Sequence, residues 1–249
     1  MELTGLIRDK EDSVTKRKLT VGLVSVLHKM PNPAEKAEPR DNSSKIFKES
    51  FCNCRRILYF WRMNAASFYP LFLKSRKVTI DSRTVEKNDL FFAFSGENFN
   101  AAKSAEDAIH KDALAVIVED KNFANPEINI FYVSSTLEFL QELAAFRRNH
   151  IKIPVIALTG SNGKTTTKEI IHAVLSRKYN VQYTFGNLNN HIGVPLTLLS
   201  IKREHELAVV EMGANHQKEI EMLCKIAQPN YGYITNFGKA HLEGFGGFE

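Results

Sequence analysis

The stretch around residue 160 constrains this chain most, because it places a glycine-bearing turn between a strand and a helix. The apolar, β-branched run of residues 153–158 has the length and composition of a buried strand. Thr159-Gly160-Ser161-Asn162-Gly163-Lys164-Thr165-Thr166 follows, and a helical pattern comes next. We expect one face of this helix to carry the apolar residues Ile170, Ile171, Val174 and Leu175. The order strand, turn, helix is that of a phosphate-binding loop.

The chemistry of such a loop follows from its place at the start of a helix. The first helical amides have no intrahelical acceptor and carry the positive end of the helix dipole, so they bind phosphate oxygens. Gly160 and Gly163 would let the backbone approach closely, Lys164 would reach the β- and γ-phosphates, and the Thr165 hydroxyl would ligate Mg²⁺. The general pattern has Gly where this chain has Leu158. The alternative is a plain turn before an ordinary helix, but Gly-Lys-Thr-Thr directly after a buried-type strand favours a nucleotide site.

Charge is unevenly distributed along the chain. The net charge is +5, and residues 1–62 hold 13 Lys and Arg against 8 Asp and Glu, whereas residues 63–249 hold 20 of each. The excess therefore lies in the first quarter, and we expect no nucleic acid partner for the rest. We predict that residues 1–62 form a basic, disordered extension and that Met63 is the functional start.

The sequence lacks the features that would indicate a membrane span, a secretory signal peptide or a cysteine framework. No run approaches the ~20 apolar residues of a membrane span, and the basic residues 16–18 before the apolar residues 19–27 lack the cleavage site of a signal peptide. Cys52, Cys54 and Cys224 make neither a zinc site nor a disulfide framework. We therefore expect a cytoplasmic protein with reduced thiols.

Residues 63–150 show the pattern of a compact α+β or α/β domain that is separate from residues 151–249. We expect strands at residues 78–80, 90–94, 114–118 and 130–133, and helices at about residues 101–111 and 136–149. Ser82 and Arg83 follow the first of these strands, where an arginine beside a hydroxyl suits a diphosphate. Taken alone, the pair is more often a solvated turn.

Residues 151–249 alternate strands and helices, which predicts a parallel sheet covered on both faces. We expect strands at residues 181–184, 207–212 and 231–235, and helices at residues 194–199 and 217–226. Ligands in such folds bind at the carboxyl ends of the strands, so Glu211 could hold Mg²⁺ and His241 could hold a metal or a phosphate. Either one could instead be a surface residue. The loop containing Asn187, Asn189, Asn190 and His191 would face the same edge, although such loops are often only turns.

Together these segments resemble the Mur ligase family. The matching stretches are Thr159-Gly160-Ser161-Asn162-Gly163-Lys164-Thr165-Thr166-Thr167, Gly186-Asn187-Leu188-Asn189-Asn190 with Ile192-Gly193-Val194-Pro195, Glu211-Met212-Gly213-Ala214-Asn215-His216, and Ala240-His241-Leu242-Glu243-Gly244-Phe245-Gly246. In that family the loop begins with Thr-Gly, which accounts for Leu158. Most of these stretches are typical of the branch that adds D-alanyl-D-alanine.

The resemblance implies an ATP-dependent amide ligase of peptidoglycan precursor synthesis. The terminal carboxylate of UDP-N-acetylmuramoyl-tripeptide would attack the γ-phosphate of ATP, and the amine of D-alanyl-D-alanine would capture the acyl phosphate. Lys164, Glu211 and His241 would be the catalytic residues, because Lys164 and Mg²⁺ would neutralise charge on the transferring phosphoryl group. By the resemblance, Thr165 and Glu211 would hold one Mg²⁺, and Glu211 with His241 a second.

The same resemblance assigns the substrate contacts. Ser82, Arg83 and Asn98 would lie in the domain that grips the uridine diphosphate, and Asn187, Asn190 and His191 would also contact substrate. Asn100-Ala101 stands where the family usually has Asp-Gly, which puts the contacts of that loop in question.

The family has three domains, and this chain ends at Glu249 inside the central one. The resemblance therefore implies a domain at residues 63–150 for the sugar nucleotide and an incomplete ATP-binding domain at residues 151–249, with the C-terminal domain absent. We expect a monomeric fragment with weak or no ligase turnover. A P-loop kinase, a sister ligase adding a different amino acid, and a nucleotide-binding module without catalysis remain as alternatives.

Overall fold

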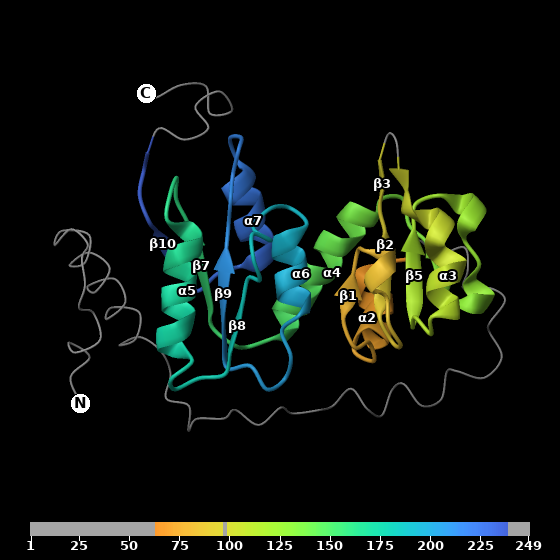
Figure 1. The fold of residues 1–249 in the computed structure, drawn as a ribbon, viewed down its shortest axis with the longest axis horizontal. Helices are drawn as coiled ribbons and strands as arrows, with labels where there is room; N and C mark the ends of the chain where they lie inside the picture. Colours follow the sequence, from red (N-terminus) through yellow and green to blue (C-terminus); the bar gives the residue numbers. More distant parts are fainter. Residues whose placement is uncertain (1–62, 97–98, 239–249) are drawn as a thin grey trace. The chain divides into compact units, whose positions relative to one another are not determined.

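The computed structural model describes residues 63–96 and 99–238, and it contains two four-stranded parallel sheets (Figure 1). The strand order is β1-β2-β5-β6 in the first sheet and β10-β7-β9-β8 in the second. Every neighbouring pair within these two sheets is parallel, and helices lie between the strands in sequence. The predicted α/β class with a parallel P-loop sheet is therefore confirmed.

The first sheet is formed by residues 63–150, the N-terminal half. Its strands are β1 (Val78–Thr79), β2 (Leu90–Ala93), β5 (Ala115–Val118) and β6 (Ile130–Tyr132). Its helices are α2 (Ala65–Phe72), α3 (Ala105–His110) and α4 (Thr136–His150), with the short 3-10 turns η3 (Ser82–Thr84), η4 (Ala101–Ser104), η5 (Lys121–Phe123) and η6 (Pro126–Ile128). Two short antiparallel strands, β3 (Ser95–Gly96) and β4 (Phe99–Asn100), form a separate pair.

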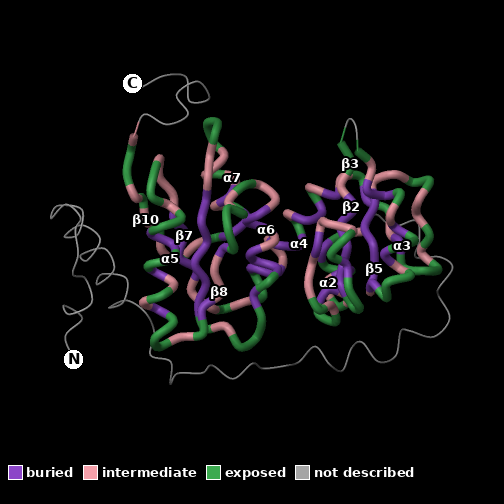
Figure 2. Tube along the Cα trace, viewed as in Figure 1, coloured by how far each residue is buried: buried purple, intermediate pink, exposed green. Residues whose placement is uncertain are grey.

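The second sheet is formed by residues 151–238, the C-terminal half. Its strands are β7 (Val155–Thr159), β8 (Val181–Tyr183), β9 (Leu207–Glu211) and β10 (Tyr231–Ile234). Its helices are α5 (Lys164–Leu175), α6 (Gly193–Leu199) and α7 (Glu219–Ala227). Strand β9 is buried along its whole length, whereas β10 alternates exposed and half-buried residues (Figure 2). Because β7 and β9 are neighbours, residues that come directly after these two strands meet at one edge of the sheet.

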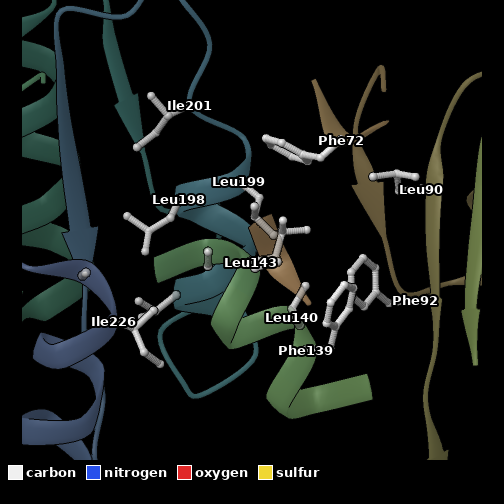
Figure 3. Close-up of a cluster of buried hydrophobic side chains, with 14 of the residues drawn as sticks. Phe72, Leu90, Phe92, Phe139, Leu140, Leu143, Leu198, Leu199, Ile201 and Ile226 are labelled. Atoms are coloured by element: carbon white, nitrogen blue, oxygen red, sulfur yellow. The ribbon is translucent and has the colours of Figure 1, made fainter. Parts of the chain in front are cut away.

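One hydrophobic cluster is shared by the two halves (Figure 3). Helix α4 contributes Leu140 and Leu143, which lie between the first sheet and helix α6. The other members labelled in Figure 3 are Phe72, Leu90, Phe92, Phe139, Leu198, Leu199, Ile201 and Ile226. The sequence predicts an N-terminal domain separate from the second half of the chain. The sheets are separate, but this cluster joins the two halves through α4.

Two buried arginines at the end of α4 strengthen that connection. Arg147 donates to the Tyr69 hydroxyl at 2.9 Å and to the Ile201 carbonyl at 2.7 Å. Arg148 donates to the carbonyls of Ala227 and Gln228, at 2.8 and 2.9 Å from its Nε and Nη2. Burial lowers the pKa of Arg148, yet its hydrogen bonds satisfy the guanidinium. Main-chain carbonyls left open where α7 ends thus find donors on α4.

The structure corrects some details of the sequence prediction. Ile170, expected on the apolar face of α5, is 42% exposed, and the buried residues of that helix are Thr167, Lys168, Ile171 and Leu175. Helix α2 and the β3–β4 pair were not predicted. Cys224 is a free thiol whose pKa is raised by burial, and Cys52 and Cys54 lie outside the described residues. Among helices of the described residues, none is long and apolar enough to cross a membrane.

Candidate nucleotide and metal site

The predicted phosphate loop connects β7 to α5. Strand β7 ends at Thr159 and helix α5 begins at Lys164. Gly160 has φ +138° and Gly163 has φ +76°, conformations that side chains of L-residues rarely adopt. The glycines therefore permit the turn that brings the amino end of α5 to the carboxyl end of the strand. Thr166 lies in the exposed first turn of α5.

Lys164 folds back over this loop. Its ammonium nitrogen Nζ donates to the carbonyl of Gly160 at 2.7 Å and to that of Ser161 at 3.3 Å. The positive charge is thereby kept at the loop rather than extended into solvent. It adds to the partial positive charge that the opening amides of α5 provide for an anion.

The segment after β10 fastens the loop. The Asn236 carbonyl accepts from the Ser161 amide at 3.2 Å, and its side-chain Oδ1 accepts from the Asn162 amide at 3.0 Å. Thr235 donates to the Asn162 carbonyl at 2.6 Å, and the Ser161 hydroxyl lies 2.8 Å from the Gly238 amide, which donates to it. Ser161 and Asn162 were predicted to bind the nucleotide. In the structure their amides and the Ser161 side chain hold the loop against residues 235–238.

Glu211 lies at the end of β9, next to the loop. It is fully buried, and its Oε1 accepts from the Thr165 hydroxyl at 3.2 Å and from Asn189 Nδ2 at 2.8 Å. Its main-chain amide donates to the Thr184 hydroxyl at 2.9 Å. The structure thus brings together Thr165 and Glu211, the two residues for which the sequence analysis predicted a common Mg²⁺.

Glu211 and its polar partners Thr165, Asn189 and Lys168 form one cluster of side chains, and the sequence analysis missed Lys168. Its side chain is completely buried, and its Nζ lies 3.8 Å from Glu211 Oε2 and 3.1 Å from Glu169 Oε1. The same nitrogen donates to the Gly186 carbonyl at 2.9 Å and lies over the ring of Tyr183, 5.6 Å from its centroid. The available signal was its position on α5, one turn before the buried Ile171.

The side chains of this cluster fit a divalent cation. Glu211 Oε2 is buried and has no hydrogen bond partner among the described residues. A carboxylate oxygen beside a threonine hydroxyl is a donor set that Mg²⁺ accepts, and Mg²⁺ usually completes its shell with water and substrate phosphates. Within residues 63–96 and 99–238, no group of three or more His, Cys, Asp or Glu side chains could hold a metal unaided. The fit therefore depends on oxygens that a ligand would bring.

The asparagine loop between β8 and α6 contributes one side chain to the cluster. That side chain is Asn189, which donates to Glu211, and the main-chain carbonyl of Asn189 accepts from the Gly213 amide at 2.7 Å. Asn190 Oδ1 accepts from the amides of Ile192 and Gly193, at 3.1 and 2.9 Å, and so holds the turn that leads into α6. Asn187 is exposed, and the carbonyl of His191 accepts from Gln141 on α4 at 3.0 Å. Of the three loop residues predicted to bind substrate, Asn187, Asn190 and His191, none has a hydrogen bond or ion pair with Glu211.

The predicted diphosphate site lies at the end of β1 in the N-terminal half. Asp81 accepts from Arg83 Nη2 at 2.7 Å, and Asp81 Oδ1 accepts from the Arg83 amide at 3.0 Å. These hydrogen bonds from Arg83 lower the pKa of Asp81 to about 2. The Arg83 side chain is 87% exposed, and the Ser82 carbonyl accepts from Lys111. Arg83 is therefore accessible, and its only ion pair among the described residues is with Asp81.

Two predicted site residues, Asn98 and His241, lie outside the described residues. Asn100, where the sequence departs from the Asp-Gly of the family, is described. Its Oδ1 accepts from the Ala102 amide at 2.9 Å and caps η4, which is a role that aspartate also fills. Ala101 is buried without a positive φ, so this turn has no need of glycine.

A parallel sheet with a glycine-bearing loop, a lysine, and a carboxylate on the adjacent strand defines a P-loop nucleotide-binding protein. Comparison with known families narrows this class. The profile of the Mur ligase family catalytic domain matches residues 74–148, and that of the Mur ligase middle domain matches residues 158–249. The chain belongs to the Mur ligase family.

Relatives and solved structures place the similarity within one branch. The UDP-N-acetylmuramoyl-tripeptide--D-alanyl-D-alanine ligase of Haemophilus influenzae is 43% identical over 174 residues, which cover 68% of this chain and 38% of that protein. A crystal structure of MurF from Acinetobacter baumannii matches with a TM-score of 0.64 and 38% identity, over 76% of this chain and 44% of that one. The chain thus spans less than two fifths of the length of the Haemophilus ligase.

A further solved structure carries a nucleotide. The MurF ligase of Thermotoga maritima, crystallised in complex with ADP, matches with a TM-score of 0.61 and 36% identity. The match covers 69% of this chain and 39% of that one. That ligase, to which this chain is similar, therefore binds ADP.

Proposed function

We propose that this chain provides the nucleotide site of an ATP-dependent ligase that joins D-alanyl-D-alanine to UDP-N-acetylmuramoyl-tripeptide in the synthesis of peptidoglycan precursors. The observation that supports it most is the buried Glu211 carboxylate, which lies 3.2 Å from the Thr165 hydroxyl at the start of α5. A lysine, a threonine and a carboxylate at the carboxyl ends of adjacent strands are the groups that a Mg·ATP complex requires. Mg²⁺ would supply charge neutralisation at the β- and γ-phosphates.

The residues of the loop would have different tasks. The amides that open α5, from Gly163 to Thr166, would bind phosphate oxygens, and Lys164 would neutralise charge on the γ-phosphoryl group. Thr165 and Glu211 would hold Mg²⁺, and His241 would complete a second metal position. Thr159, Gly160, Ser161 and Asn162 would line the nucleotide from the rest of the loop, and Ser161 and Asn162 also keep the loop attached to residues 235–238.

Phosphorylation explains why such a ligase consumes ATP. A carboxylate is a poor electrophile at neutral pH, and its attack on the γ-phosphate would give an acyl phosphate with a good leaving group. The amine of D-alanyl-D-alanine would then form the amide and release phosphate. In this proposal Ser82, Arg83 and Asn98 bind the uridine diphosphate, and Asn187, Asn190 and His191 contact the rest of the substrate. The protein would act in the cytoplasm as a monomer.

Binding of the sugar nucleotide tests the substrate class. In an isothermal titration, UDP-N-acetylmuramoyl-tripeptide should bind this chain, and UDP should compete while AMP should not. Arg83→Met should weaken the affinity about tenfold, because a charge-assisted bidentate contact to the diphosphate is lost. Lys87→Met, which removes a lysine from an exposed pair with Asp112, is the matched control and should leave binding unchanged. A folded chain that binds no UDP derivative would contradict the proposal.

The reaction itself is tested by phosphate release. Turnover by this chain is expected to be weak at most, and any phosphate release from ATP should depend on both the tripeptide substrate and D-alanyl-D-alanine. A panel of UDP-muramoyl peptides and amino acids separates this activity from that of a sister ligase, which would respond to a different acceptor. Nucleotide binding without release under any combination would identify a binding module without catalysis.

A further inference from the structure

Lys168 has a position that the proposed roles do not explain. Its side chain is completely buried on the inner face of α5, and a buried ammonium group is costly unless charged or polar partners compensate it. Three oxygens do so, those of Glu169, Gly186 and Glu211, at 3.1, 2.9 and 3.8 Å. Glu211 lies at the proposed metal position, and Gly186 lies at the start of the asparagine loop whose Asn189 contacts Glu211.

The contacts of Lys168 also determine where the Glu211 carboxylate points. Through Gly186 the lysine fixes the start of the asparagine loop, and Asn189 of that loop donates to Glu211 Oε1 at 2.8 Å. The other oxygen, Oε2, has no hydrogen bond within the described residues and faces the ammonium. Lys168 therefore holds the carboxylate from both sides, directly at Oε2 and through the loop at Oε1.

The charges around Glu211 nearly cancel in the described residues. Glu211 and Lys168 are both fully buried, whereas the side chain of Glu169 is 50% exposed and so is partly screened by water. A divalent cation arriving alone at Oε2 would meet an ammonium group 3.8 Å from the oxygen it needs. Repulsion between two cations at such a distance is substantial in a buried site. The phosphates of a nucleotide would supply the missing negative charge.

We propose that Lys168 is a positioning residue that makes binding of the divalent cation depend on the nucleotide. The ammonium neutralises Glu211 in the absence of ligand, so the site rejects free Mg²⁺ and accepts it only with the phosphates. This inference rests on the proposed nucleotide site and adds an order of binding to it. Mg²⁺ therefore binds together with ATP and does not occupy the site before the nucleotide is bound.

The test measures the binding of Mg²⁺ in the absence of nucleotide, by calorimetry and by the shift of the melting temperature with MgCl₂. The native chain and Lys168→Arg should show neither heat nor a shift. Lys168→Met leaves Glu211 without its counter-charge, so Mg²⁺ should bind at least about tenfold more tightly than to the native chain and should raise the melting temperature. The double variant Lys168→Met with Glu211→Gln should lose that response. A purely structural role for Lys168 predicts destabilisation without any new Mg²⁺ binding.

Lys225→Met is the matched control, because it removes a lysine from the exposed ion pair with Glu221 on α7. It should behave as the native chain does. Circular dichroism checks folding, and if Lys168→Met does not fold, Lys168→Gln serves in its place. The inference would also be overturned if the native protein bound Mg²⁺ with the same affinity in the absence and in the presence of ADP.

The outcomes for the two proposals can be distinguished. Failure of the nucleotide site would appear as no heat when Mg·ADP is added to the native chain. The role of Lys168 is decided by the titrations with Mg²⁺ alone. Folded Lys168→Met or Lys168→Gln that stays indifferent to Mg²⁺ would refute the role of Lys168 and leave nucleotide binding intact.

Discussion

Two charged regions predicted from the sequence differ in how the structure satisfies them. At the phosphate loop, Glu211 is fully buried, and one of its oxygens has no hydrogen bond partner among the described residues. At the end of β1, the Asp81 and Arg83 side chains satisfy each other in an exposed turn. A buried carboxylate oxygen without a hydrogen bond lowers the stability of the fold, so its presence indicates a ligand site. An exposed pair costs little and gives no such indication.

Arg148 shows that burial of a charged side chain does not by itself indicate a ligand site. Its guanidinium is buried as well, but it donates to carbonyls of Ala227, Gln228 and Ile151 and to the side chain of Asn230. We infer that it has a structural role, in contrast to Glu211. Substitutions at both kinds of position test or sharpen this comparison, beginning with the largest effect.

Replacing Arg148 by Met should destabilise the chain by about 3 kcal/mol, because several buried carbonyls lose their donor. Urea unfolding followed by circular dichroism measures this. Under conditions where the variant is folded, its affinity for Mg·ADP should equal that of the native chain. A folded Arg148→Met with impaired nucleotide binding would break the distinction between the two buried charges.

Replacing Glu211 by Gln should weaken binding of Mg·ADP about 100-fold, since one ligand of the metal and its negative charge are lost. The loss should largely disappear when ADP is titrated in EDTA, because the loop amides and Lys164 remain. Calorimetry with and without Mg²⁺ gives both values. Equal loss in the two conditions would mean that Glu211 acts on the fold of the loop rather than on a metal.

The two loop glycines offer a matched pair. Both have a positive φ, but a Cβ on Gly163 would meet nothing within 4 Å, whereas one on Gly160 would overlap the Thr235 side chain and approach the Asn236 backbone. Gly163→Ala should therefore cost about 1–2 kcal/mol of backbone strain. Gly160→Ala should cost more, because residues 235–238 must also move. Equal costs in urea unfolding would show that these residues do not hold the loop.

The smallest effect is expected at Arg83. Arg83→Met should leave the melting temperature at neutral pH unchanged, since its side chain is 87% exposed. The pKa of Asp81 should rise from about 2 toward its ordinary value, because the hydrogen bonds from Arg83 lower it. In the native chain the stability that this exposed pairing adds is present above the ordinary pKa of aspartate and is lost as the pH falls toward 2, but solvent screening makes it too small to move the melting temperature. Carboxyl NMR titration measures the shift, and an unchanged Asp81 would refute the pairing.

The sequence predicted the strands and helices whose periodicity is regular. Strands β5, β7 and β9 are apolar runs, with a polar residue only at the carboxyl end of β7 and β9, and they lie in the interior of their sheets as such runs should. Helix α2 was missed because it is short and contains Pro70, which sequence rules place outside helices. The β3–β4 pair was missed because its strands are only two residues long, which leaves no alternation to detect.

The same contrast holds for the site. Thr165 and Glu211 could be paired from sequence because parallel strands and a P-loop fix where each must lie. Lys168 was missed, although it lies one turn before Ile171, because a lysine beside Glu169 on a helix is ordinarily solvent-exposed. Its burial depends on Gly186 and Glu211, which reach it from other elements. Likewise the bonds from the Ile192 and Gly193 amides to Asn190 Oδ1 could not be predicted from sequence, because an Asn-rich loop gives no sign of which side chain faces its own backbone.

Calorimetric titration of Mg·ATP into this chain, with Lys164→Met as the comparison, tests the central claim most directly. We predict binding at one site per chain by the native protein and an affinity at least about tenfold lower for the variant, because the loop loses its ammonium group. A folded native chain that releases no heat, or a Lys164→Met variant that binds as tightly, would contradict the nucleotide site.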